Sequence, residues 1–322
     1  MKGVCLILCV LAIIGSVRCQ LQMGFYSSSC PKAEKIVQDY VNQHIPNAPS
    51  LAAALIRMHF HDCFVRGCDG SVLLNSTSSS GNQTEKTATP NLTVRGFGFI
   101  DAIKSLVEAE CPGIVSCADI IALAARDSIV LTGGPSWKVP TGRRDGLISN
   151  QSEALAQIPA PFDNITTLIQ KFANKSLDLK DLVLLSGAHT IGISHCPSLN
   201  NRLYNFTGVG DRDPSLDSEY ADKLRQKCRT QNDTTTILEM DPGSRKTFDL
   251  SYYASVLKRR GLFESDSNLL KNTNTTTFIN QLLQGSLNFF SEFALSMEKM
   301  NQVGVKTGTT GEIRKRCAFV NS

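Results

Sequence analysis

The distribution of cysteine restricts the fold of this chain of 322 residues more than any other feature. Eleven cysteines are present, and three of them fall within the first nineteen residues. That segment carries Lys2 near its start and an apolar run over 4–14, about half the length of a membrane-spanning helix. We therefore expect residues 1–19 to be a secretory signal peptide that is cleaved before Gln20.

Removal of the signal peptide leaves eight cysteines in residues 20–322 and no second long apolar run that could anchor the chain in a membrane. The secretory pathway is oxidising, so eight cysteines most simply form four disulfides, although counting alone leaves their pairing open. Sequons for N-glycosylation agree with this route. They occur at Asn75, Asn82, Asn91, Asn150, Asn164, Asn174, Asn205, Asn232 and Asn274.

The overall composition is that of a soluble globular protein. Hydrophobic residues make up 42% and charged residues 19% of the chain, which excludes a disordered tail, a coiled coil and a multispan membrane protein. The formal net charge of +4 is small for this length. It gives no argument for nucleic-acid binding, and we expect no such partner.

Helical periodicity recurs along the chain whereas alternating strands are scarce, so the expected fold class is mainly α. Ser50 is the expected N-cap of one helix, and Asp178 opens another that ends at Gly187. The predicted helices cover residues 51–65, 98–109, 116–132, 179–186, 215–228, 251–260 and 276–300. The long connections over 75–95 and 232–247 call for ions, disulfides or a cofactor to order them.

The most informative segment runs from Arg57 to Ser71 and contains two histidines separated by one residue. His59 and His61 could suggest zinc, but helix positions two apart point about 200° away from each other and cannot share a metal. The chain also lacks the His-Glu-x-x-His pattern of a zinc hydrolase. Arg57 and His61 share one helix face, where a fixed cation beside an imidazole suits proton transfer.

The loop that follows this helix offers oxygen atoms at alternating positions. Asp62, Asp69 and Ser71 contribute side-chain oxygens. Val65 and Gly67 add main-chain carbonyls. Dense oxygen donors on a constrained loop are what Ca²⁺ prefers, and a solvated acidic turn is the alternative interpretation.

A third histidine, His189, follows directly on the helix predicted over 179–186. Its neighbours are small, which leaves room for a large flat group against the imidazole. A core histidine with satisfied hydrogen bonds would give the same pattern. A second spaced set of oxygen-bearing residues follows over 240–249.

Together these motifs make the chain resemble the class III plant secretory haem peroxidases. The resemblance covers essentially all of residues 20–322, and the two histidine motifs in this order and separation are very specific. It implies a mainly α haem peroxidase fold, in which one helical domain of two lobes with four disulfides encloses haem. Further landmarks of the family lie at 115–119, 133–137, 142–145 and 158–162.

The resemblance implies separate roles for the residues on the two faces of the haem. His189 would be the axial ligand of one haem b, with its other ring nitrogen hydrogen-bonded to Asp266. On the opposite face, His61 would take the proton from hydrogen peroxide and return it to the departing oxygen. Arg57 would stabilise the negative charge that develops as the O–O bond breaks.

On the peroxide side of the haem, called the distal side, the resemblance also places an asparagine and a glutamate next to His61, away from the haem. They correspond to Asn91 and Glu85, which would form a His61–Asn91–Glu85 relay that orients the imidazole. Asn91 should then be buried, and its sequon should carry no glycan.

Two calcium sites carry over from the family. The distal ligands would be Asp62, Val65, Gly67, Asp69 and Ser71. Glu85 would reach the distal ion through water. The proximal ligands would be Thr190, Asp241, Ser244, Thr247 and Asp249. Because Thr190 adjoins His189, loss of the proximal ion should disturb the iron.

The family pattern also selects one disulfide pairing and two further contacts. Asp119 is expected to form a buried ion pair with Arg143. The carbonyl of Pro159 would accept a hydrogen bond from a phenolic substrate at the haem edge. The expected disulfides are Cys30–Cys111, Cys63–Cys68, Cys117–Cys317 and Cys196–Cys228.

The implied activity is peroxide-dependent one-electron oxidation of phenolic donors through high-valent iron–oxo intermediates. The expected partners are hydrogen peroxide and small phenols, and the enzyme should be a monomer. Its roles would be hydrogen peroxide removal, cross-linking of lignin and other cell-wall phenolics, and the response to oxidative stress. The sequence stops shortly after Cys317, without the longer tail of some vacuolar relatives, so we expect secretion to the extracellular space or cell wall.

The non-enzymatic alternative is a calcium-stabilised cell-wall glycoprotein that keeps the fold but has lost turnover. Against it stands the joint presence of Arg57, His61, Asn91, His189 and Asp266. Two positions depart from the family pattern. Met240 stands where several members place an aromatic residue against the proximal imidazole, and Ser198 where some place a phenylalanine at the substrate entrance. These two residues bear on redox tuning and donor preference.

Overall fold

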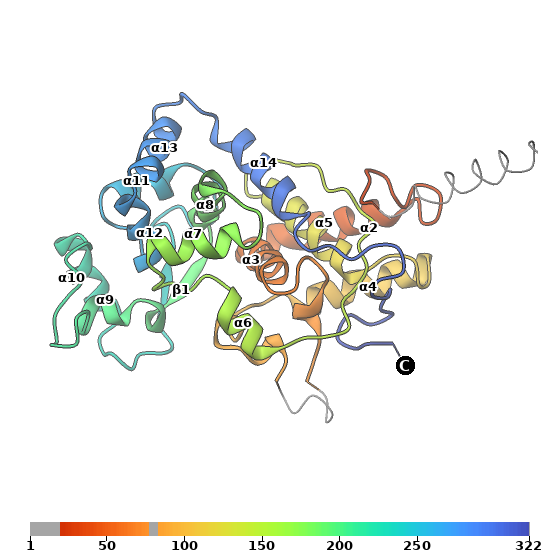
Figure 1. Ribbon diagram of the computed structural model, residues 1–322, viewed down its shortest axis with the longest axis horizontal. Coiled ribbons are helices and arrows are strands. Elements are labelled where there is room, and N and C mark those ends of the chain that lie inside the picture. Colours follow the sequence, from red (N-terminus) through yellow and green to blue (C-terminus); the bar gives the residue numbers. More distant parts are fainter. Residues whose placement is uncertain (1–19, 77–82, 322) are drawn as a thin grey trace, which may run out of the picture.

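A computed structural model describes residues 20–76 and 83–321, and within these ranges the fold is mainly α, as the sequence predicts (Figure 1). The expected signal peptide and the sequon at Asn82 lie outside the described residues. The α-helices are α2 (Ala33–His44), α3 (Ser50–Phe64), α4 (Phe97–Glu110), α5 (Cys117–Val130), α6 (Gln151–Gln157), α7 (Ile165–Ala173), α8 (Leu179–Ser186), α9 (Asn200–Tyr204), α10 (Ser218–Lys227), α11 (Ser251–Leu257), α12 (Glu264–Asn268), α13 (Thr273–Leu283) and α14 (Phe289–Met300).

Regular β structure within the described ranges is confined to one small antiparallel sheet. Strand β1 (Ile193–His195) pairs with β2 (Ile237–Glu239), and Ser194 lies opposite Leu238. Strand β2 lies inside the predicted long connection over 232–247. The other long connection contains two short 3₁₀ turns, at Glu85–Thr87 and Thr89–Asn91.

Helix α5 lies at the centre of the fold, and almost all of its side chains are buried. Its sequence is mainly apolar, and its buried charges at Asp119 and Asp127 are paired with arginines, as expected for a helix surrounded by other elements. Helix α3 packs against it most extensively, together with α2 and α4, while α8 packs against α7, α13 and α14. One continuous apolar core joins these two groups of helices, and Figure 1 shows α3 between them.

No helix within residues 20–76 and 83–321 is both long enough and apolar enough to cross a membrane. All four disulfides expected from the family pattern are present: Cys30–Cys111, Cys63–Cys68, Cys117–Cys317 and Cys196–Cys228. The Cys117–Cys317 bond joins residues 200 positions apart and ties the C-terminal segment to the start of α5. The disulfides therefore connect segments that are distant in the sequence.

Several predicted helix boundaries are confirmed by their caps. The side chain of Asp178 accepts a hydrogen bond from the main-chain amide of Asp181, and the side chain of Asp181 accepts one from the main-chain amide of Asp178, so α8 begins with a capping box. Ser116 caps α5 from the position before its first helical residue, because its hydroxyl accepts a hydrogen bond from the main-chain amide of Asp119. The start of α10 is an exception, because the side chain of Asp217 caps this helix and its first residue is Ser218, not the predicted residue 215.

Other predicted boundaries are wrong. Ser50 is the first residue of α3 and not its N-cap, because Pro49 before it already has nearly helical dihedral angles (φ −62°, ψ −22°). Helix α11 ends at Leu257 and not at residue 260. The single helix predicted over 276–300 is two helices, because Gly285 adopts φ +74° and Asn288 caps a new start at α14.

Helix α8 ends at Ser186 with Gly187 as its C-cap, as predicted. Residues Gly187–Thr190 continue from α8 as a 3₁₀ turn, and the φ of Gly187 is −59°. A Cβ atom at this position would lie 2.4 Å from the hydroxyl oxygen of Tyr253. Glycine is therefore needed here for close packing, and this packing places the turn that carries His189.

Candidate functional site

The last turns of α3 present Arg57 and His61 on one face, as their spacing predicts. Nε of Arg57 lies 3.4 Å from Nε2 of His61. The other guanidinium nitrogens donate to the hydroxyl of Thr93 at 3.0 Å and to the main-chain carbonyl of Pro90 at 2.7 Å. Burial lowers the pKa of Arg57 to about 10, which leaves the guanidinium cationic at neutral pH.

His61 is buried, and Asn91 holds its imidazole through Nδ1, the ring nitrogen that does not face Arg57. Nδ1 of His61 lies 2.5 Å from Oδ1 of Asn91, whose Nδ2 donates to the main-chain carbonyl of Glu85 at 2.8 Å. The three residues of the expected relay are thus brought together, but the last contact uses the main chain of Glu85 and not its carboxylate. Burial and the neighbouring Arg57 guanidinium lower the pKa of His61 to about 3, so the imidazole is neutral at neutral pH.

His59 faces a different environment, as the helix geometry predicts. Its Nε2 lies 2.5 Å from Oδ1 of Asn301, and the side chain is fully buried. The sulfur atoms of Cys63 and Cys68 lie nearby, but they are joined in a disulfide and cannot act as thiolate ligands. This cluster is therefore structural, and the zinc interpretation receives no support.

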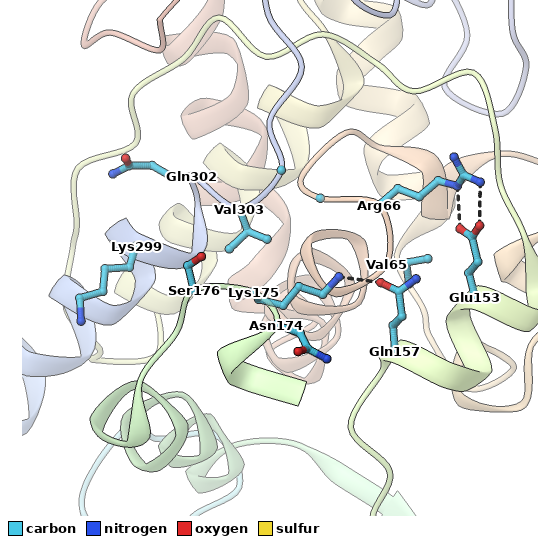
Figure 2. Close-up of a pocket in the computed structure, with 12 residues that line it drawn as sticks. Val65, Arg66, Glu153, Gln157, Asn174, Lys175, Ser176, Lys299, Gln302 and Val303 are labelled. Atoms are coloured by element: carbon cyan, nitrogen blue, oxygen red, sulfur yellow. Dashed lines mark hydrogen bonds and ion pairs between the residues drawn. The ribbon is translucent and has the colours of Figure 1, made fainter. Parts of the chain in front are cut away.

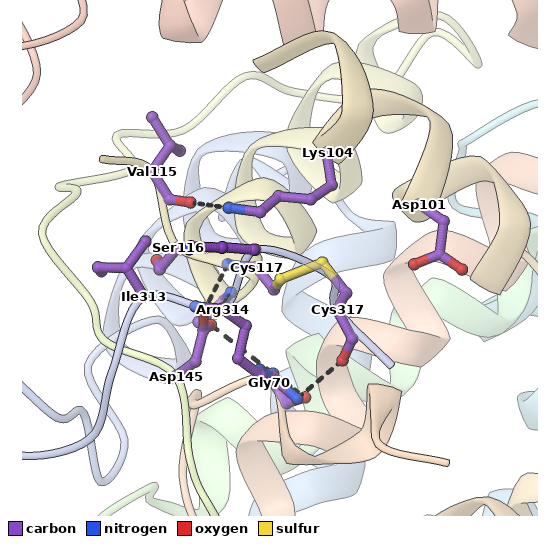
Figure 3. The surroundings of a disulfide bond; sticks show 12 residues. Gly70, Asp101, Lys104, Val115, Ser116, Cys117, Asp145, Ile313, Arg314 and Cys317 are labelled. Carbon is purple, nitrogen blue, oxygen red and sulfur yellow. Dashed lines mark hydrogen bonds and ion pairs between the residues drawn. A yellow bond between two sulfur atoms is a disulfide. The ribbon is translucent and has the colours of Figure 1, made fainter. Parts of the chain in front are cut away.

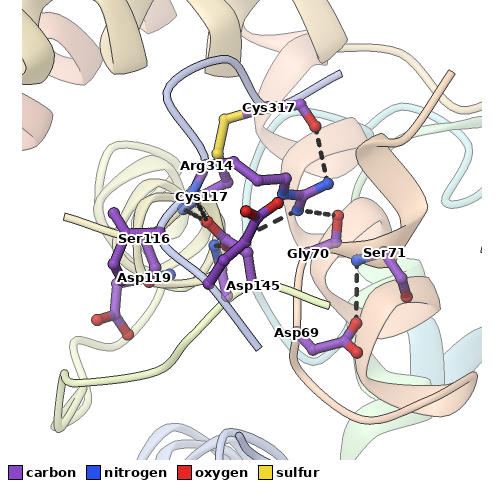
Figure 4. A network of polar contacts seen from close by, with 12 residues as sticks. Asp69, Gly70, Ser71, Ser116, Cys117, Asp119, Asp145, Arg314 and Cys317 are labelled. Atoms are coloured by element: carbon purple, nitrogen blue, oxygen red, sulfur yellow. Dashed lines mark hydrogen bonds and ion pairs between the residues drawn. A yellow bond between two sulfur atoms is a disulfide. The ribbon is translucent and has the colours of Figure 1, made fainter. Parts of the chain in front are cut away.

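The five residues of the expected distal calcium site are buried at the end of α3 and in the loop that follows it: Asp62 lies in the last turn of α3, and Val65, Gly67, Asp69 and Ser71 lie in the next seven residues. The carboxylate of Asp62 accepts hydrogen bonds from the amides of Gly70 at 2.9 Å and Val72 at 3.4 Å. Figure 4 shows the amide of Ser71 donating to Asp69, over 3.0 Å. Burial and the charge of Asp69 raise the pKa of Asp62 to about 8.

Several oxygen atoms in and beside this loop fit a cation. The hydroxyl of Ser71 and both carboxylate oxygens of Glu85 are buried and have no hydrogen-bond partner among the described residues. Burial and the charge of Asp62 raise the pKa of Glu85. Lys306 supplies one positive charge, with Nζ 2.8 Å from Oδ2 of Asp69. These buried carboxylate and hydroxyl oxygens face few hydrogen-bond donors. Oxygen atoms of this kind are the ligands that Ca²⁺ prefers.

A buried network holds this loop against the C-terminal segment (Figure 3, Figure 4). Arg314 donates to the carbonyl of Gly70 at 2.6 Å and to that of Cys317 at 2.8 Å. Its charge faces Asp145 at 3.7 Å, which also accepts hydrogen bonds from the first main-chain amides of α5. Gly70 has φ +69°, and a Cβ atom there would lie 2.5 Å from Arg314, so only glycine fits this contact.

His189 lies in the turn after α8 and pairs with Asp266, the third residue of α12. Nδ1 of His189 lies 2.9 Å from Oδ1 of Asp266. The same carboxylate accepts hydrogen bonds from the Tyr252 hydroxyl at 2.9 Å and the Phe263 amide at 2.8 Å. Burial alone would raise the pKa of Asp266, but the charge and hydrogen bond of His189 and the two other donors lower it below its ordinary value. Asp266 is therefore ionised.

The surroundings of His189 fit an axial ligand of haem. The rings of Tyr252 and Phe263 meet the imidazole edge-on, with centroids 5.7 and 5.3 Å away. The imidazole side chain remains 36% exposed, and Nε2 has no hydrogen-bond partner among the described residues. A histidine that donates Nδ1–H to a buried carboxylate has the orientation typical of a metal ligand.

The expected proximal calcium residues also lie together, with one addition. Thr190 donates to Oδ1 of Asp249 at 3.0 Å, and Ser244 donates to Oδ2 at 2.8 Å. Thr247 joins the same turn through its amide, which donates to the carbonyl of Ser244. The hydroxyl of Ser251 contacts both Asp249 and the remaining predicted residue, Asp241. Burial and the charge of Asp249 raise the pKa of Asp241, although the Ser251 hydrogen bond opposes this.

Two further expected residues have clear positions. Arg143 pairs with Asp119 at 2.7 Å, and both side chains are fully buried, as predicted. Pro159 follows α6 and is half-buried. Its carbonyl accepts no hydrogen bond from the described residues, so it is available to a donor from outside the chain.

A groove of about 660 Å³ lies beside the loop after α3, because Val65 and Gly67 of the expected distal calcium site are among the residues that line it (Figure 2). It is lined by residues of the segments 65–67, 174–176 and 302–304, among others, and by neither His61 nor His189. Figure 2 shows Arg66 paired with Glu153 and Lys175 hydrogen-bonded to Gln157. With these groups paired, the groove offers no reactive side chain and is not the candidate active site.

Sequence reasoning missed three residues that complete the site. Thr93 holds Arg57, Ser251 joins the proximal oxygen cluster, and Tyr252 donates to Asp266. Thr93 and Tyr252 carry no local signal, because their contacts depend on tertiary packing. Ser251 could have been found as one more oxygen in the same spacing as Ser244, Thr247 and Asp249.

Comparison with known proteins agrees with this geometry. A family model described as Peroxidase matches residues 37–285. The chain is 69% identical to Peroxidase 3 of Arabidopsis thaliana, over 97% of this chain and 96% of that protein. It is 66% identical to Peroxidase 39 of Arabidopsis thaliana, over 98% and 97% of the two chains, and 54% identical to Peroxidase 1 of Oryza sativa subsp. japonica, over 98% and 97%. The chain therefore belongs to the class III plant peroxidases, a haem-dependent family, and is an oxidoreductase that acts on hydrogen peroxide.

Proposed function

We propose that this peroxidase oxidises small phenols with hydrogen peroxide at a haem held between the two histidine-bearing segments. The haem, when bound, supplies the redox chemistry: two electrons reduce peroxide to water, and two phenol molecules replace them one at a time. The protein supplies positioned proton carriers, charges and an axial ligand. The residues that we assign to these tasks are Arg57, His61, Asn91, Glu85, His189 and Asp266.

His61 acts as the proton carrier for peroxide. The side-chain oxygen of Asn91 can only accept, so Nδ1 of His61 carries hydrogen and Nε2 keeps its lone pair. Nε2 takes the proton from one peroxide oxygen and delivers it to the other, which leaves as water. A pKa of about 3 favours this cycle, because the imidazole is neutral before peroxide arrives.

Arg57 and Glu85 support this proton transfer. The guanidinium of Arg57 lies beside Nε2 of His61 and stabilises the negative charge on the departing oxygen. Glu85 orients Asn91 through its main-chain carbonyl, and its carboxylate faces the proposed distal cation through water. This assignment gives the two parts of Glu85 different tasks.

His189 would hold the haem iron through Nε2, and Asp266 would support it as the partner of Nδ1. The buried carboxylate holds the imidazole by Nδ1 and increases its electron donation to the metal. Asp266 is well suited to this task because its pKa is lowered and it remains charged.

We assign two structural calcium ions to the two oxygen clusters. The distal ion would be held by Asp62 at the end of α3 and by Val65, Gly67, Asp69 and Ser71 in the following segment. The proximal ion is held by Thr190, Asp241, Ser244, Thr247 and Asp249. Ser251 lies within the second cluster and supports Asp241 and Asp249. The observation that favours the distal ion most directly is the buried hydroxyl of Ser71, which has no hydrogen-bond partner within residues 20–76 and 83–321.

Phenolic donors approach the carbonyl of Pro159, which accepts their hydroxyl hydrogen. The proposed setting is the cell wall or extracellular space, reached by way of the signal peptide at 1–19, with residues 20–322 as one monomeric peroxidase domain. There the enzyme removes hydrogen peroxide, cross-links lignin and other wall phenolics, and takes part in the response to oxidative stress. The exposed sequons, such as Asn164 and Asn205, suit a glycoprotein of that location.

One observation carries this proposal: the protein contains both a neutral His61 held by the side-chain amide of Asn91 and a His189 held by the carboxylate of Asp266. Purified enzyme with haem and calcium should oxidise a phenol such as guaiacol only when peroxide is present. His61→Leu should lower the turnover about 10²- to 10⁴-fold while the protein keeps its haem. A haem-loaded variant with wild-type turnover would remove His61 from the mechanism.

A further inference from the structure

The carboxylate of Asp266 receives a donor that the pairing with His189 does not require. The hydroxyl of Tyr252 donates to Oδ1 of Asp266 at 2.9 Å, and this is the same oxygen atom that lies 2.9 Å from Nδ1 of His189. The other carboxylate oxygen accepts the amide of Phe263 at 2.8 Å. We infer that Tyr252 is a positioning residue that limits how strongly Asp266 polarises His189. This inference rests on the axial role proposed for His189.

The surrounding packing fixes Tyr252 in this position. Its side chain is 2% exposed, and its ring meets the imidazole of His189 at 85° with centroids 5.7 Å apart. The same side chain therefore touches the imidazole with its ring and the partner of that imidazole with its hydroxyl. The packing of the ring keeps the hydroxyl next to the carboxylate of Asp266, with the Ser186 hydroxyl as a second polar group beside it.

The start of α11 carries three consecutive hydroxyl groups with separate partners. Ser251 contacts Asp241 and Asp249, whereas Tyr253 donates to the main-chain carbonyl of Val183 at 3.0 Å. Tyr252 alone among the three donates to Asp266. The adjacent Tyr253 is equally buried, so it provides a matched control in the same helix turn.

Two donors on one carboxylate oxygen compete for the same electron density. The Tyr252 hydrogen bond withdraws charge from Oδ1 and weakens that oxygen as an acceptor for His189. The imidazole then has less imidazolate character and donates less to a metal at Nε2. Loss of the hydroxyl should strengthen the His189–Asp266 bond and favour the ferric over the ferrous state.

A purely structural hydroxyl would behave differently. If Tyr252 merely satisfies a buried donor, its removal would change stability and leave the metal unaffected. The readouts must therefore report on the iron and its axial bond and not on activity alone.

The experiment compares haem-loaded wild type with Tyr252→Phe and Tyr253→Phe. Spectroelectrochemistry gives the ferric/ferrous equilibrium, and resonance Raman of the ferrous protein gives the iron–imidazole stretching frequency. Tyr252→Phe should lower the ferrous-to-ferric ratio at a fixed electrode potential roughly two- to tenfold, as the loss of one hydrogen bond would. It should also raise the stretching frequency. Tyr253→Phe should change neither quantity, and circular dichroism should show that both variants are folded.

Two results would overturn the inference, and they can be told apart. If Tyr252→Phe matches the wild type in both readouts, or if Tyr253→Phe shifts them equally, Tyr252 has no specific effect on the pair. If the wild-type protein itself shows no iron–imidazole stretch, or keeps it unchanged in His189→Ala, the axial role of His189 fails and the inference fails with it.

Discussion

Nδ1 of His61 lies 2.5 Å from the side-chain oxygen of Asn91, and Asn91 is anchored in turn by the main-chain carbonyl of Glu85. This relationship fixes both the orientation and the tautomer of the imidazole. A main-chain anchor is insensitive to the charge of the Glu85 carboxylate. The proposed proton carrier is therefore aligned by neutral groups, and the carboxylate of Glu85 is left for the proposed cation site.

The first prediction concerns this amide anchor. Asn91→Leu removes the acceptor for Nδ1, so His61 can rotate or change tautomer, and the rate constant for reaction with peroxide should fall about 10- to 100-fold. Stopped-flow absorbance of the haem measures this rate. The matched control is Asn301→Leu, because Asn301 contacts His59 at the same distance and lies outside the site. Equal effects of the two substitutions would contradict a specific role for Asn91.

The second prediction is the pH dependence of the peroxide reaction. His61 has a pKa of about 3 against an ordinary value of 6.5, so the rate constant should stay level from pH 7 to about 4 and fall below that. Arg57→Leu removes a repelling charge and should shift the acid limb to higher pH. The same pKa difference makes folding less favourable below pH 6.5, because the unfolded chain binds the proton first. An acid limb near pH 6.5 in a protein that remains folded would contradict the assignment.

The third prediction concerns removal of calcium. Without a cation, the buried carboxylates of Asp62, Asp69 and Glu85 repel one another, and the loop next to His61 should loosen before the helices melt. Chelator treatment should therefore lower phenol oxidation several-fold while circular dichroism is retained. Calcium should restore activity and magnesium should not, because Mg²⁺ demands a smaller octahedral site. Unchanged turnover after metal analysis has verified removal would count against both proposed sites.

The fourth prediction concerns glycosylation. Asn91 is 2% exposed and holds His61, so its sequon should be empty in protein secreted from a plant cell. Asn164, Asn174 and Asn274 are exposed and serve as internal controls. Mass spectrometry of glycopeptides gives the occupancy of each sequon. Full occupancy at Asn91 in active enzyme would refute the position assigned to it.

Helix spacing and helix capping predicted those parts of the fold and the site that depend on residues close together in the sequence. The four-residue spacing of Arg57 and His61 placed both on one face of α3, and the acidic pair Asp178 and Asp181 marked the start of α8. The break at Gly285 was missed because the sequence on both sides keeps a helical pattern. Disulfide pairing came from the family resemblance alone, since counting cysteines does not choose among pairings.

Tertiary contacts explain what sequence reasoning could not provide. The hydrogen bond from Tyr252 to Asp266 joins two helices, and that from Arg57 to Thr93 joins a helix to a loop 36 residues later. The use of the Glu85 main chain in place of its carboxylate depends on the local 3₁₀ turn. No periodicity or residue type signals such contacts.

The reaction of the resting enzyme with hydrogen peroxide tests the central claim most directly. When haem-loaded wild type is mixed with hydrogen peroxide, its Soret band should shift. The rate of this shift should be proportional to the peroxide concentration. His61→Leu should keep the resting band but slow the shift about 10²- to 10⁴-fold. A protein that stays colourless when haem is supplied, or a His61→Leu variant that reacts as fast as the wild type, would contradict the account.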